Sequence, residues 1–353
     1  MSIYTNPDFD HHELVSFKDD KSTGLRAIIA VHNSNLGPAL GGCRMFPYTN
    51  EAAALSDVLR LSRGMTYKSA LAGLPLGGGK AVIMGDPRKD KTRKLMLAMG
   101  EFIESQNGRY ISAEDSGTGV EDIATMAEST KYISGLVKGE KHGGDPSPTT
   151  AYGVFQGLKA AVRYKYNSDL IGVRIAIQGV GNVGYHLASY LQSAGAKVLA
   201  ADIHRENIDR AVTELGVEEV GINDILSADV DVLAPCAMGG AVNPQSLLSI
   251  KAGIIAGAAN NQLATKDMGM ALLEQDILYA PDYVINSGGI IDAFYQTTGN
   301  RDTVVLRNHV DRIGGTLMEI FHRANELGRS TSSVADLMAE EVFEKSGKEN
   351  KVA

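Results

Sequence analysis

Two lysines stand out by their spacing. Lys68 and Lys80 lie twelve residues apart and enclose a segment that ends in three consecutive glycines, Gly77 to Gly79. Glycine lets a backbone approach another surface closely, and Lys80 opens an apolar run, residues 81–84. A lysine that lies beside a second cation and away from bulk water should give up its proton more readily. We therefore expect Lys80 to act as a general base and Lys68 to bind a substrate carboxylate. The alternative is that both are ordinary solvated lysines.

A carboxylate follows a short predicted strand in the same half of the chain. Residues 109–113, Arg-Tyr-Ile-Ser-Ala, predict a strand that delivers Glu114 and Asp115 at its carboxyl end. Open α/β sheets bind their ligands beyond that end, so Asp115 is well positioned for chemistry. The alternative is an aspartate that caps a helix or forms a turn.

A glycine-rich turn is the clearest local signal. The apolar residues 174–178 predict a buried strand, and the pattern GxGxxG follows at once, with glycines at 179, 181 and 184. A helix and the strand 197–201 come next, and Asp202 lies 18 residues beyond the last glycine. This order is typical of a dinucleotide site, in which the turn approaches a pyrophosphate and the acid binds the adenosine ribose. Asp202 favours NAD, although His204 and Arg205 close by leave a 2′-phosphorylated cofactor open.

Three further predicted strands end in residues suited to line a cofactor cleft. We expect these strands at residues 230–234, 253–258 and 277–285. The first is followed by Cys236 and Ala237, the second by Asn260 and Asn261, and the third by Asn286. Asparagine at a strand end is often only a turn former, but three such ends in succession favour a site.

The remaining pattern completes the expected elements. A first strand is predicted at 25–32, and the glycine-rich residues 34–44 are expected to form a loop. Asn50 should cap a helix that carries Leu55, Val58, Leu59 and Ser62 on one face. Further helices are predicted at 91–105, 149–166, 304–327 and from 330 onward, with a disordered polar tail at 345–351. The run 138–147, punctuated by glycine and proline, is the expected domain boundary.

Length and composition narrow the function classes. A chain of 353 residues, with 44% hydrophobic and 22% charged residues, is typical of a globular protein of about two domains. Its net charge of −8 argues against a nucleic-acid partner. Cys43 and Cys236 lack a CxxC spacing, which fits a reducing cytoplasm. We find no apolar run long enough to cross a membrane, no signal peptide and no cluster of metal ligands.

These residues together resemble the amino-acid dehydrogenases of the glutamate, leucine, phenylalanine and valine superfamily, and among them the leucine dehydrogenases most. The likeness extends from about Leu36 to Glu341, and the matching stretches are Leu36 to Arg44, Leu61 to Ile83, Ala113 to Gly117, Gly179 to Val183, Ala234 to Gly240, Gly257 to Leu263 and Pro281 to Gly289. The resemblance implies an α/β protein with an α/β substrate and oligomerisation domain (1–145 plus 331–353), an NAD-binding Rossmann domain (146–330) and a cleft between them.

The resemblance also assigns roles to residues. Lys80 and Asp115 match the catalytic lysine and aspartate of the family, and Lys68 matches the lysine that binds the substrate carboxylate, helped by Gly41 and Met65. The cofactor would contact residues of the second domain: Thr150, Gly179, Val180, Gly181, Asn182, Val183, Gly184, Asp202, Cys236, Ala237, Asn260, Asn261 and Asn286. Two positions depart from the leucine dehydrogenases, with Cys43 in place of threonine and Ser116 in place of a hydrophobic residue.

The implied reaction is the reversible, NAD-dependent oxidative deamination of an L-amino acid to a 2-oxo acid and ammonia. Leu40 stands where glutamate dehydrogenases have a lysine, so a charged substrate side chain would face an apolar wall. We expect Leu40, Ala113, Ile290 and Ala293 to line the side-chain pocket, and leucine, valine and isoleucine to be preferred; plain core packing is the alternative for Leu40 and Ile290. An aromatic amino-acid dehydrogenase for phenylalanine or tryptophan is the next candidate, followed by a non-catalytic NAD-binding regulator. A cytoplasmic homo-oligomer, either a dimer or an octamer, is expected.

Overall fold

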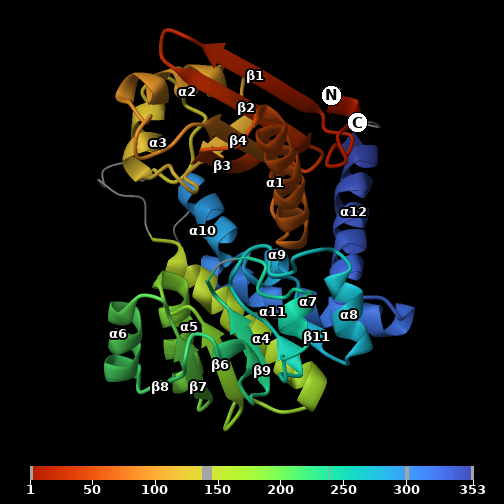
Figure 1. Cartoon of the computed structure of the whole chain (residues 1–353). Helices are drawn as coiled ribbons and strands as arrows, with labels where there is room; N and C mark the ends of the chain where they lie inside the picture. The colour runs from red at the N-terminus through yellow and green to blue at the C-terminus, as the bar shows by residue number, and fades with distance from the viewer. Residues whose placement is uncertain (1–2, 137–144, 238, 299–301, 351–353) are drawn as a thin grey trace. The chain divides into compact units, whose positions relative to one another are not determined.

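The computed structural model describes residues 3–136, 145–237, 239–298 and 302–350 (Figure 1). These residues form two compact units. Unit 1 comprises Met1–Gly144, Ala293–Arg301 and Ala339–Ala353, and unit 2 comprises Asp145–Asp292 and Asp302–Met338. Two segments therefore group differently from the expected domain limits: residues 293–301 belong with unit 1, and residues 331–338 belong with unit 2. Most of the expected boundary segment, 138–147, lies outside the described residues.

Unit 1 is built on a five-stranded sheet. Its strands are β1 (Leu14–Asp20), β2 (Leu25–Asn33), β3 (Ala39–Phe46), β4 (Gly77–Met84) and β5 (Tyr110–Ala113), in the order β1-β2-β4-β3-β5. The pairs β1–β2 and β2–β4 are antiparallel, whereas β3 is parallel to both β4 and β5. The prediction of a loop over residues 34–44 was wrong from residue 39 onward, and β1 was not predicted.

The glycines that suggested a loop serve close contacts within this sheet. A Cβ added at Gly41 would lie 1.8 Å from the carbonyl oxygen of Gly79 in β4, and one at Gly42 would lie 2.7 Å from the Cβ of Asp115. Only glycine fits these positions without a shift of the backbone. The triple glycine likewise forms the first residues of β4 instead of preceding it.

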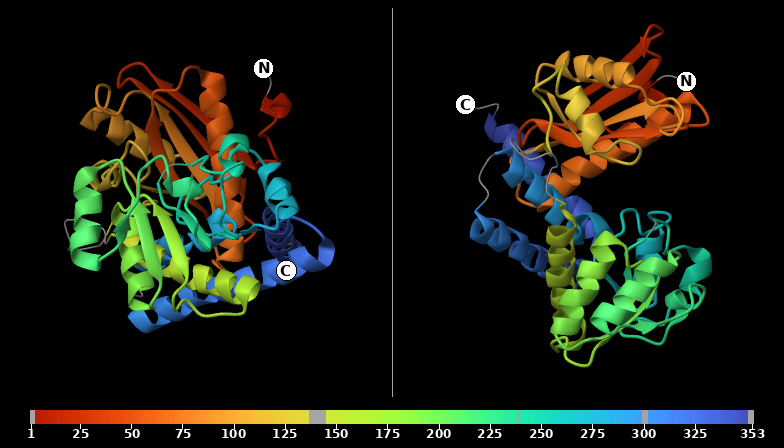
Figure 2. Two further views of the ribbon diagram at one scale, coloured as in Figure 1. Left: turned by 60° about the horizontal axis from the view of Figure 1, so that its bottom comes forward. Right: turned by 90° about the vertical axis from the view of Figure 1, so that its left-hand side faces the viewer.

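Helices cover both faces of this sheet (Figure 2). Alternation in β2 sends Leu25, Ala27, Ile29 and Val31 to the face covered by α2 (Arg93–Glu104) and α3 (Val120–Met126). Ile28 and Ala30 point to the other face, where they pack with Ala54, Val58 and Leu59 of α1 (Glu51–Leu71). The predicted cap of α1 is confirmed, because the Asn50 side chain accepts a hydrogen bond from the N–H of Ala53 at 2.9 Å.

Unit 2 contains a six-stranded sheet in which every pair is parallel. The strands are β6 (Arg174–Gln178), β7 (Lys197–Ala201), β8 (Glu218–Glu219), β9 (Val232–Pro235), β10 (Ile254–Ile255) and β11 (Leu278–Tyr279). Their order, β11-β10-β9-β6-β7-β8, reverses direction at β6, as in a doubly wound Rossmann sheet. The predicted α/β fold class is confirmed, and β6 and β7 occupy the residues expected for them.

The helices of unit 2 flank this sheet, and α4 packs against both α5 and α11 (Figure 1). The helices after residue 144 are α4 (Ser147–Tyr166), α5 (Asn182–Ser193), α6 (Arg205–Leu215), α7 (Pro244–Leu247), α8 (Met268–Glu274), α9 (Asp282–Ile285), α10 (Gly288–Thr297), α11 (Thr303–Leu327) and α12 (Thr331–Asn350). Short 3₁₀ turns lie at Ile3–Thr5 and Ile225–Ser227. Two predictions were wrong: residues 282–285 are helical instead of extended, and the polar tail is helical through Asn350. None of the helices in the described segments has the length and apolarity that a membrane span requires.

Candidate active site

Lys80 lies on the face of the unit 1 sheet that α1 covers. In β4, Ala81 and Ile83 point toward α2, whereas Val82 packs with α1, so the side chain of Lys80 belongs to the α1 face. The same alternation places Leu40, Gly42 and Arg44 of β3 on this face, because Ala39, Cys43 and Met45 point the other way. The sheet thus gathers these side chains above one surface.

Strand β4 and helix α1 approach each other closely here. A Cβ at Gly78 would lie 2.1 Å from the backbone nitrogen of Thr66. Lys68 is in the last turn of α1 and Met65 is one turn earlier; both side chains are half-buried. The short approach at Gly78 therefore holds the end of α1 that carries Lys68 against the strand that carries Lys80.

Lys80 forms an ion pair with Asp115, to which its ammonium group donates a hydrogen bond. The side chain of Lys80 is 6% exposed and that of Asp115 is 16% exposed. Lys80 is thus paired with a carboxylate, whereas the second cation expected beside it from the sequence, Lys68, stays a prediction. A buried amine and a buried carboxylate that share a hydrogen bond can exchange a proton directly.

The two oxygens of Asp115 have separate partners. Oδ2 accepts from Lys80, while Oδ1 accepts from the backbone N–H of Ser116 at 2.6 Å and from Nε of Arg44 at 3.2 Å. Burial opposes ionisation of this carboxyl. The positive charges of Lys80 and Arg44 and the hydrogen bonds from Lys80 and Ser116 outweigh that effect and lower the pKa of Asp115 below its ordinary value. Asp115 is therefore held as a carboxylate in one orientation.

Arg44, Asp57 and Tyr48 form a second layer behind Asp115 that sequence reasoning missed. Arg44 Nη1 donates to Asp57 Oδ2 at 3.0 Å, and the Tyr48 hydroxyl donates to the same oxygen at 2.7 Å. The signal was available once residues 39–46 are read as a strand, because period two then puts Arg44 on the same face as Gly42, which contacts Asp115.

The expected substrate-pocket residues of unit 1 share this face. In the parallel pair of β3 and β5, Leu40 lies opposite Ile111 and Gly42 lies opposite Ala113. Leu40 is buried, and Ala113 is half-buried at the end of β5. The carbonyl oxygen of Gly41 accepts a hydrogen bond from the Tyr110 hydroxyl at 2.7 Å. Ile290 belongs to α10 in unit 2, so its place beside Leu40 stays a prediction.

Cys43, one of the two departures from the resemblance, packs toward α2. It is fully buried, and burial raises the pKa of its thiol to about 12. The thiol therefore stays protonated near neutral pH and acts as a small apolar side chain.

In unit 2, the glycine turn joins β6 to α5 as predicted. Gly179 adopts a φ of +94°, a backbone conformation that favours glycine, and a Cβ at Gly184 would lie 2.0 Å from the carbonyl oxygen of Gly179. A Cβ at Gly181 would have no atom of the described residues within 4 Å, and no side chain among them caps α5. The turn therefore leaves room, and backbone N–H groups, for a phosphate at the start of α5.

Asp202 is fixed beside this turn. Its Oδ2 accepts a hydrogen bond from the N–H of Val180 and its Oδ1 one from the N–H of His204, each at 2.8 Å. Asn182 and Val183 lie in the first turn of α5. Ala237, next to Cys236, lies close to the turn. A Cβ added at Gly179 would lie 2.8 Å from the Cβ of Ala237.

The other predicted cofactor residues lie past the carboxyl ends of neighbouring strands or near them. Asn286 Nδ2 donates to Asn260 Oδ1 at 2.7 Å, and Asn261 adopts a positive φ of 53°. Thr150, in the first turn of α4, is close to Gly289, where an added Cβ would lie 2.7 Å from the threonine hydroxyl. Gln178 Oε1 and Asn286 Oδ1 are buried acceptors without a hydrogen-bond partner among the described residues. Such acceptors fit the polar groups of a bound nucleotide.

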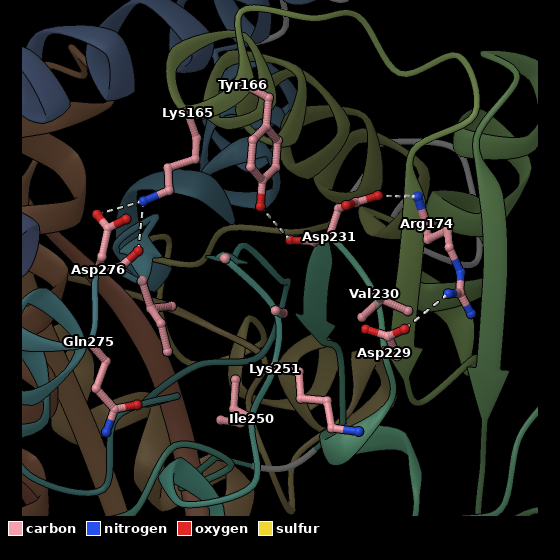
Figure 3. Close-up of a pocket in the computed structure, with 13 residues that line it drawn as sticks. Lys165, Tyr166, Arg174, Asp229, Val230, Asp231, Ile250, Lys251, Gln275 and Asp276 are labelled. Atoms are coloured by element: carbon pink, nitrogen blue, oxygen red, sulfur yellow. Dashed lines mark hydrogen bonds and ion pairs between the residues drawn. The ribbon is translucent and has the colours of Figure 1, made fainter.

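A pocket at the opposite edge of the unit 2 sheet is a weaker candidate. It has a volume of about 600 Å³ and surrounds the amino-terminal ends of β6, β9, β10 and β11 (Figure 3). Its charged groups largely pair with one another: Lys165 with Asp276 at 2.7 Å, and Arg174 with Asp229 at 3.6 Å. Because these pairs satisfy each other and ligands of open α/β sheets bind at the carboxyl edge, we do not assign a site here.

The fold and the two groups of residues define a two-domain dehydrogenase. Unit 2 has the sheet order and the glycine turn of a dinucleotide-binding domain, and unit 1 carries a buried lysine–carboxylate pair. Comparison with known proteins agrees. Residues 11–132 match the family described as "Glu/Leu/Phe/Val dehydrogenase, dimerisation domain", and residues 144–208 and 202–326 match "Glutamate/Leucine/Phenylalanine/Valine dehydrogenase". The chain belongs to this family of amino-acid dehydrogenases.

Individual relatives differ in the substrate that their names give. Leucine dehydrogenase of Geobacillus stearothermophilus is 47% identical over 346 residues, which cover 98% of this chain and 94% of the relative. Phenylalanine dehydrogenase of Caldalkalibacillus thermarum is 44% identical, covering 99% and 96%. The crystal structure of L-tryptophan dehydrogenase from Nostoc punctiforme matches with a TM-score of 0.84 and 41% identity, covering 95% of this chain and 97% of that one.

Proposed function

We propose that this amino-acid dehydrogenase catalyses the reversible, NAD-dependent oxidative deamination of apolar L-amino acids, with leucine, valine and isoleucine preferred, to 2-oxo acids and ammonia. The observation that carries the proposal is the buried ion pair of Lys80 and Asp115 on the α1 face of unit 1. Leucine dehydrogenases among the similar relatives support the branched-chain preference.

In this mechanism the side chains of unit 1 bind the substrate and move protons. Lys68, near the end of α1, binds the substrate carboxylate. Asp115 accepts a proton from the substrate ammonium group and releases it to solvent before hydride transfer. The ionised Asp115 then takes the proton of Lys80, and the neutral Lys80 takes a proton from the water that attacks the iminium carbon. Asp115 then protonates the leaving amine, which departs as ammonia. The bound nicotinamide supplies the acceptor for the hydride that leaves the substrate Cα.

The residues of unit 2 fit an NAD-type cofactor. The N–H groups at the start of α5 would bind the pyrophosphate, and Asp202 retains acceptor positions for ribose hydroxyls beyond its two backbone hydrogen bonds. Arg205, the side chain that could have favoured a 2′-phosphate, instead pairs with Asp209 at 2.5 Å and Glu219 at 2.7 Å. We therefore propose NAD over NADP.

The proposed specificity depends on an apolar side-chain pocket. Leu40 is buried on the same face as Lys80 and offers no charged partner to a carboxylate in the substrate side chain, so glutamate is disfavoured as a substrate. Ala113 leaves room at the end of β5, and Ile290 would complete the pocket. The second candidate is an aromatic amino-acid dehydrogenase, which the similarity to phenylalanine and tryptophan dehydrogenases favours. An apolar pocket separates such substrates by only about 1–3 kcal/mol per methylene.

The dimerisation domain named for residues 11–132 supports assembly as a homo-oligomer, a dimer or an octamer.

The test measures NADH and NADPH formation with leucine, valine, isoleucine, phenylalanine, tryptophan and glutamate. We expect the highest kcat/KM for a branched-chain substrate with NAD and no measurable rate with glutamate. A higher kcat/KM for phenylalanine or tryptophan would favour the second candidate.

The catalytic assignment is tested by Lys80→Ala and Asp115→Asn. We expect each variant to lose at least about 10³-fold in kcat, because the general base or its proton partner is missing. NADH binding, measured by fluorescence titration, should stay within about twofold of the wild type, since neither residue lies in unit 2. Turnover near the wild-type rate in either variant would contradict the assignment.

A further inference from the structure

Arg44 bridges Asp115 to a second carboxylate, Asp57. Its Nε donates to Asp115 Oδ1 at 3.2 Å, and its Nη1 donates to Asp57 Oδ2 at 3.0 Å. The guanidinium group is rigid and planar, so two contacts from different nitrogens fix its orientation. The Tyr48 hydroxyl donates to the same Oδ2 of Asp57, while the exposed Arg60 pairs with the other oxygen, Oδ1, at 3.3 Å. Arg44 thus connects α1, β3 and the residues that follow β5.

This arrangement divides the two oxygens of Asp115. Because Arg44 and the Ser116 N–H both donate to Oδ1, Oδ2 is the oxygen that faces Lys80. Without Arg44, the Ser116 N–H alone would hold Oδ1, and the carboxylate would be less restrained against rotation about its Cβ–Cγ bond. Proton transfer requires the donor and acceptor atoms at hydrogen-bond distance in a defined orientation.

We propose that Arg44 is a positioning residue for the reaction: its guanidinium group helps to hold Asp115 turned so that Oδ2 meets Lys80, and Asp57 in turn holds Arg44. This inference rests on the proposed catalytic role of Asp115. Arg44 acts through Asp115, without any contact of its own to the reacting atoms.

Charge supports the same role. Asp115 is largely buried, and burial alone would favour its neutral form; Lys80 and Arg44 supply the positive charges that lower its pKa. Lys80 exchanges its proton during the reaction, whereas a guanidinium stays charged at every pH used for assays. The titratable and charged groups that interact with Asp115 include Lys80 from β4, Arg44 and the Cys43 thiol from β3, and the Tyr110 hydroxyl from β5. Beyond Arg44 lie Asp57 from α1 and Tyr48.

The test compares pH profiles of full-length variants. Arg44→Gln keeps a hydrogen-bond donor but removes the charge, and Arg44→Lys keeps the charge but removes the planar fork. Because Asp115 must begin oxidative deamination as a carboxylate, the acidic limb of kcat/KM reports its ionisation. In Arg44→Gln we expect this limb to move up by roughly one pH unit and kcat to fall at least about tenfold, with the KM for NAD unchanged. In Arg44→Lys we expect a lower kcat with the limb near its wild-type position.

Arg60→Gln is the matched control, because Arg60 pairs with the same Asp57 but its side chain is 65% exposed and makes no contact with Asp115 among the interactions that the structure describes. It should keep the wild-type rate and profile. An unshifted acidic limb in Arg44→Gln, or wild-type kcat in Arg44→Lys, would overturn the inference. If Arg44→Gln has no measurable turnover, the kcat of Arg44→Lys tests the inference alone: a lowered kcat supports it and a wild-type kcat overturns it.

The outcome is separable from that of the proposed function. If Lys80→Ala and Asp115→Asn lose activity while both Arg44 variants behave as the wild type, only the role of Arg44 fails. If Asp115→Asn keeps its activity, the catalytic role of Asp115 fails and the role of Arg44 fails with it. If the wild type forms no NADH from any of the amino acids tested, the proposed function itself fails.

Discussion

At the level of single residues, Asp115 depends on a glycine for its position. Gly42 of β3 lies beneath it, and a methyl group added there would lie 2.7 Å from both Cβ and Oδ2 of Asp115. These distances are shorter than any normal contact, so Asp115 would have to shift from the position in which Oδ2 meets Lys80.

We therefore predict that Gly42→Ala lowers kcat about 100-fold, since a displacement of about 1 Å in a reacting group can cost that much. Steady-state kinetics measures the effect, and the KM for NAD should not change. Gly119→Ala is the control, because Gly119 lies four residues after Asp115, at the start of α3. Its φ is −115°, and an added Cβ would meet no described atom within 4 Å. Equal activity of the two variants would show that Gly42 has no such steric role.

Residue-level chemistry was partly readable from the sequence. The resemblance assigned Lys80 and Asp115, and the structure brings these two side chains into contact, while their catalytic roles stay predictions. Arg44 was not assigned, because residues 39–44 were read as a loop and the period-two alternation that places Arg44 beside Asp115 was not applied. A glycine-rich strand has the composition of a loop, and only its neighbours β4 and β5 show why glycine is needed.

At the level of elements, the start of α1 is determined by a local sequence signal, whereas its length depends on tertiary packing. The start of α1 was predictable because asparagine is a strong N-cap. Its extension through Met65 and Lys68 was not predictable, because the end of the helix packs against Gly78, which belongs to a strand later in the sequence. The edge strand β1 was missed for a similar reason: its composition is mixed, and it pairs with β2 along its whole length.

The cap of α1 gives a prediction about stability. Asn50→Ala removes the acceptor for the Ala53 N–H and should cost about 1 kcal/mol. For a domain of this size we expect a decrease in Tm of about 2–4 °C, measured by thermal denaturation. Asn50→Asp retains a capping oxygen and should unfold within about 1 °C of the wild type. Equal Tm values for all three proteins would show that the cap contributes nothing.

At the level of the whole molecule, a buried polar cluster ties distant parts of unit 1 together. His32 of β2 donates or accepts at Nδ1 with the Thr66 hydroxyl at 2.9 Å, and its Nε2 lies 3.5 Å from Asp10. Its ring packs against His12 and against Phe343 of α12. Burial, assisted by the charges of His12 and Arg63, lowers the pKa of His32 to about 4, although Asp10 opposes the shift.

This cluster predicts how stability depends on pH. Since His32 binds its proton only near pH 4 in the folded state, the unfolded chain takes up that proton first as the pH falls below 6.5. The stability from this group is complete above pH 6.5 and is lost as the pH falls toward 4, at up to about 1.4 kcal/mol per pH unit. Urea midpoints at pH 7.5, 6 and 5 measure this loss.

We expect His32→Gln to be less stable at pH 7.5 but to lose less stability between pH 7.5 and 5 than the wild type. His11→Asn replaces an exposed neighbouring histidine at a φ of 50°, which asparagine tolerates, and should keep the wild-type slope. A wild-type slope in His32→Gln would show that another group titrates in this range.

The division of the chain into units has a practical consequence for protein engineering. Unit 1 is encoded by three separate stretches of the gene, and Tyr67 of the first stretch hydrogen-bonds Glu340 of the last at 2.6 Å. A fragment that stops before residue 145 would lack Glu340, which accepts a hydrogen bond from the Tyr67 hydroxyl, and Phe343, whose ring packs against His32 and Tyr67. A chimera that exchanges unit 1 between relatives must therefore take the first 144 residues and the end of the final helix from the same parent. A chimera with a single junction would take these two segments from different parents.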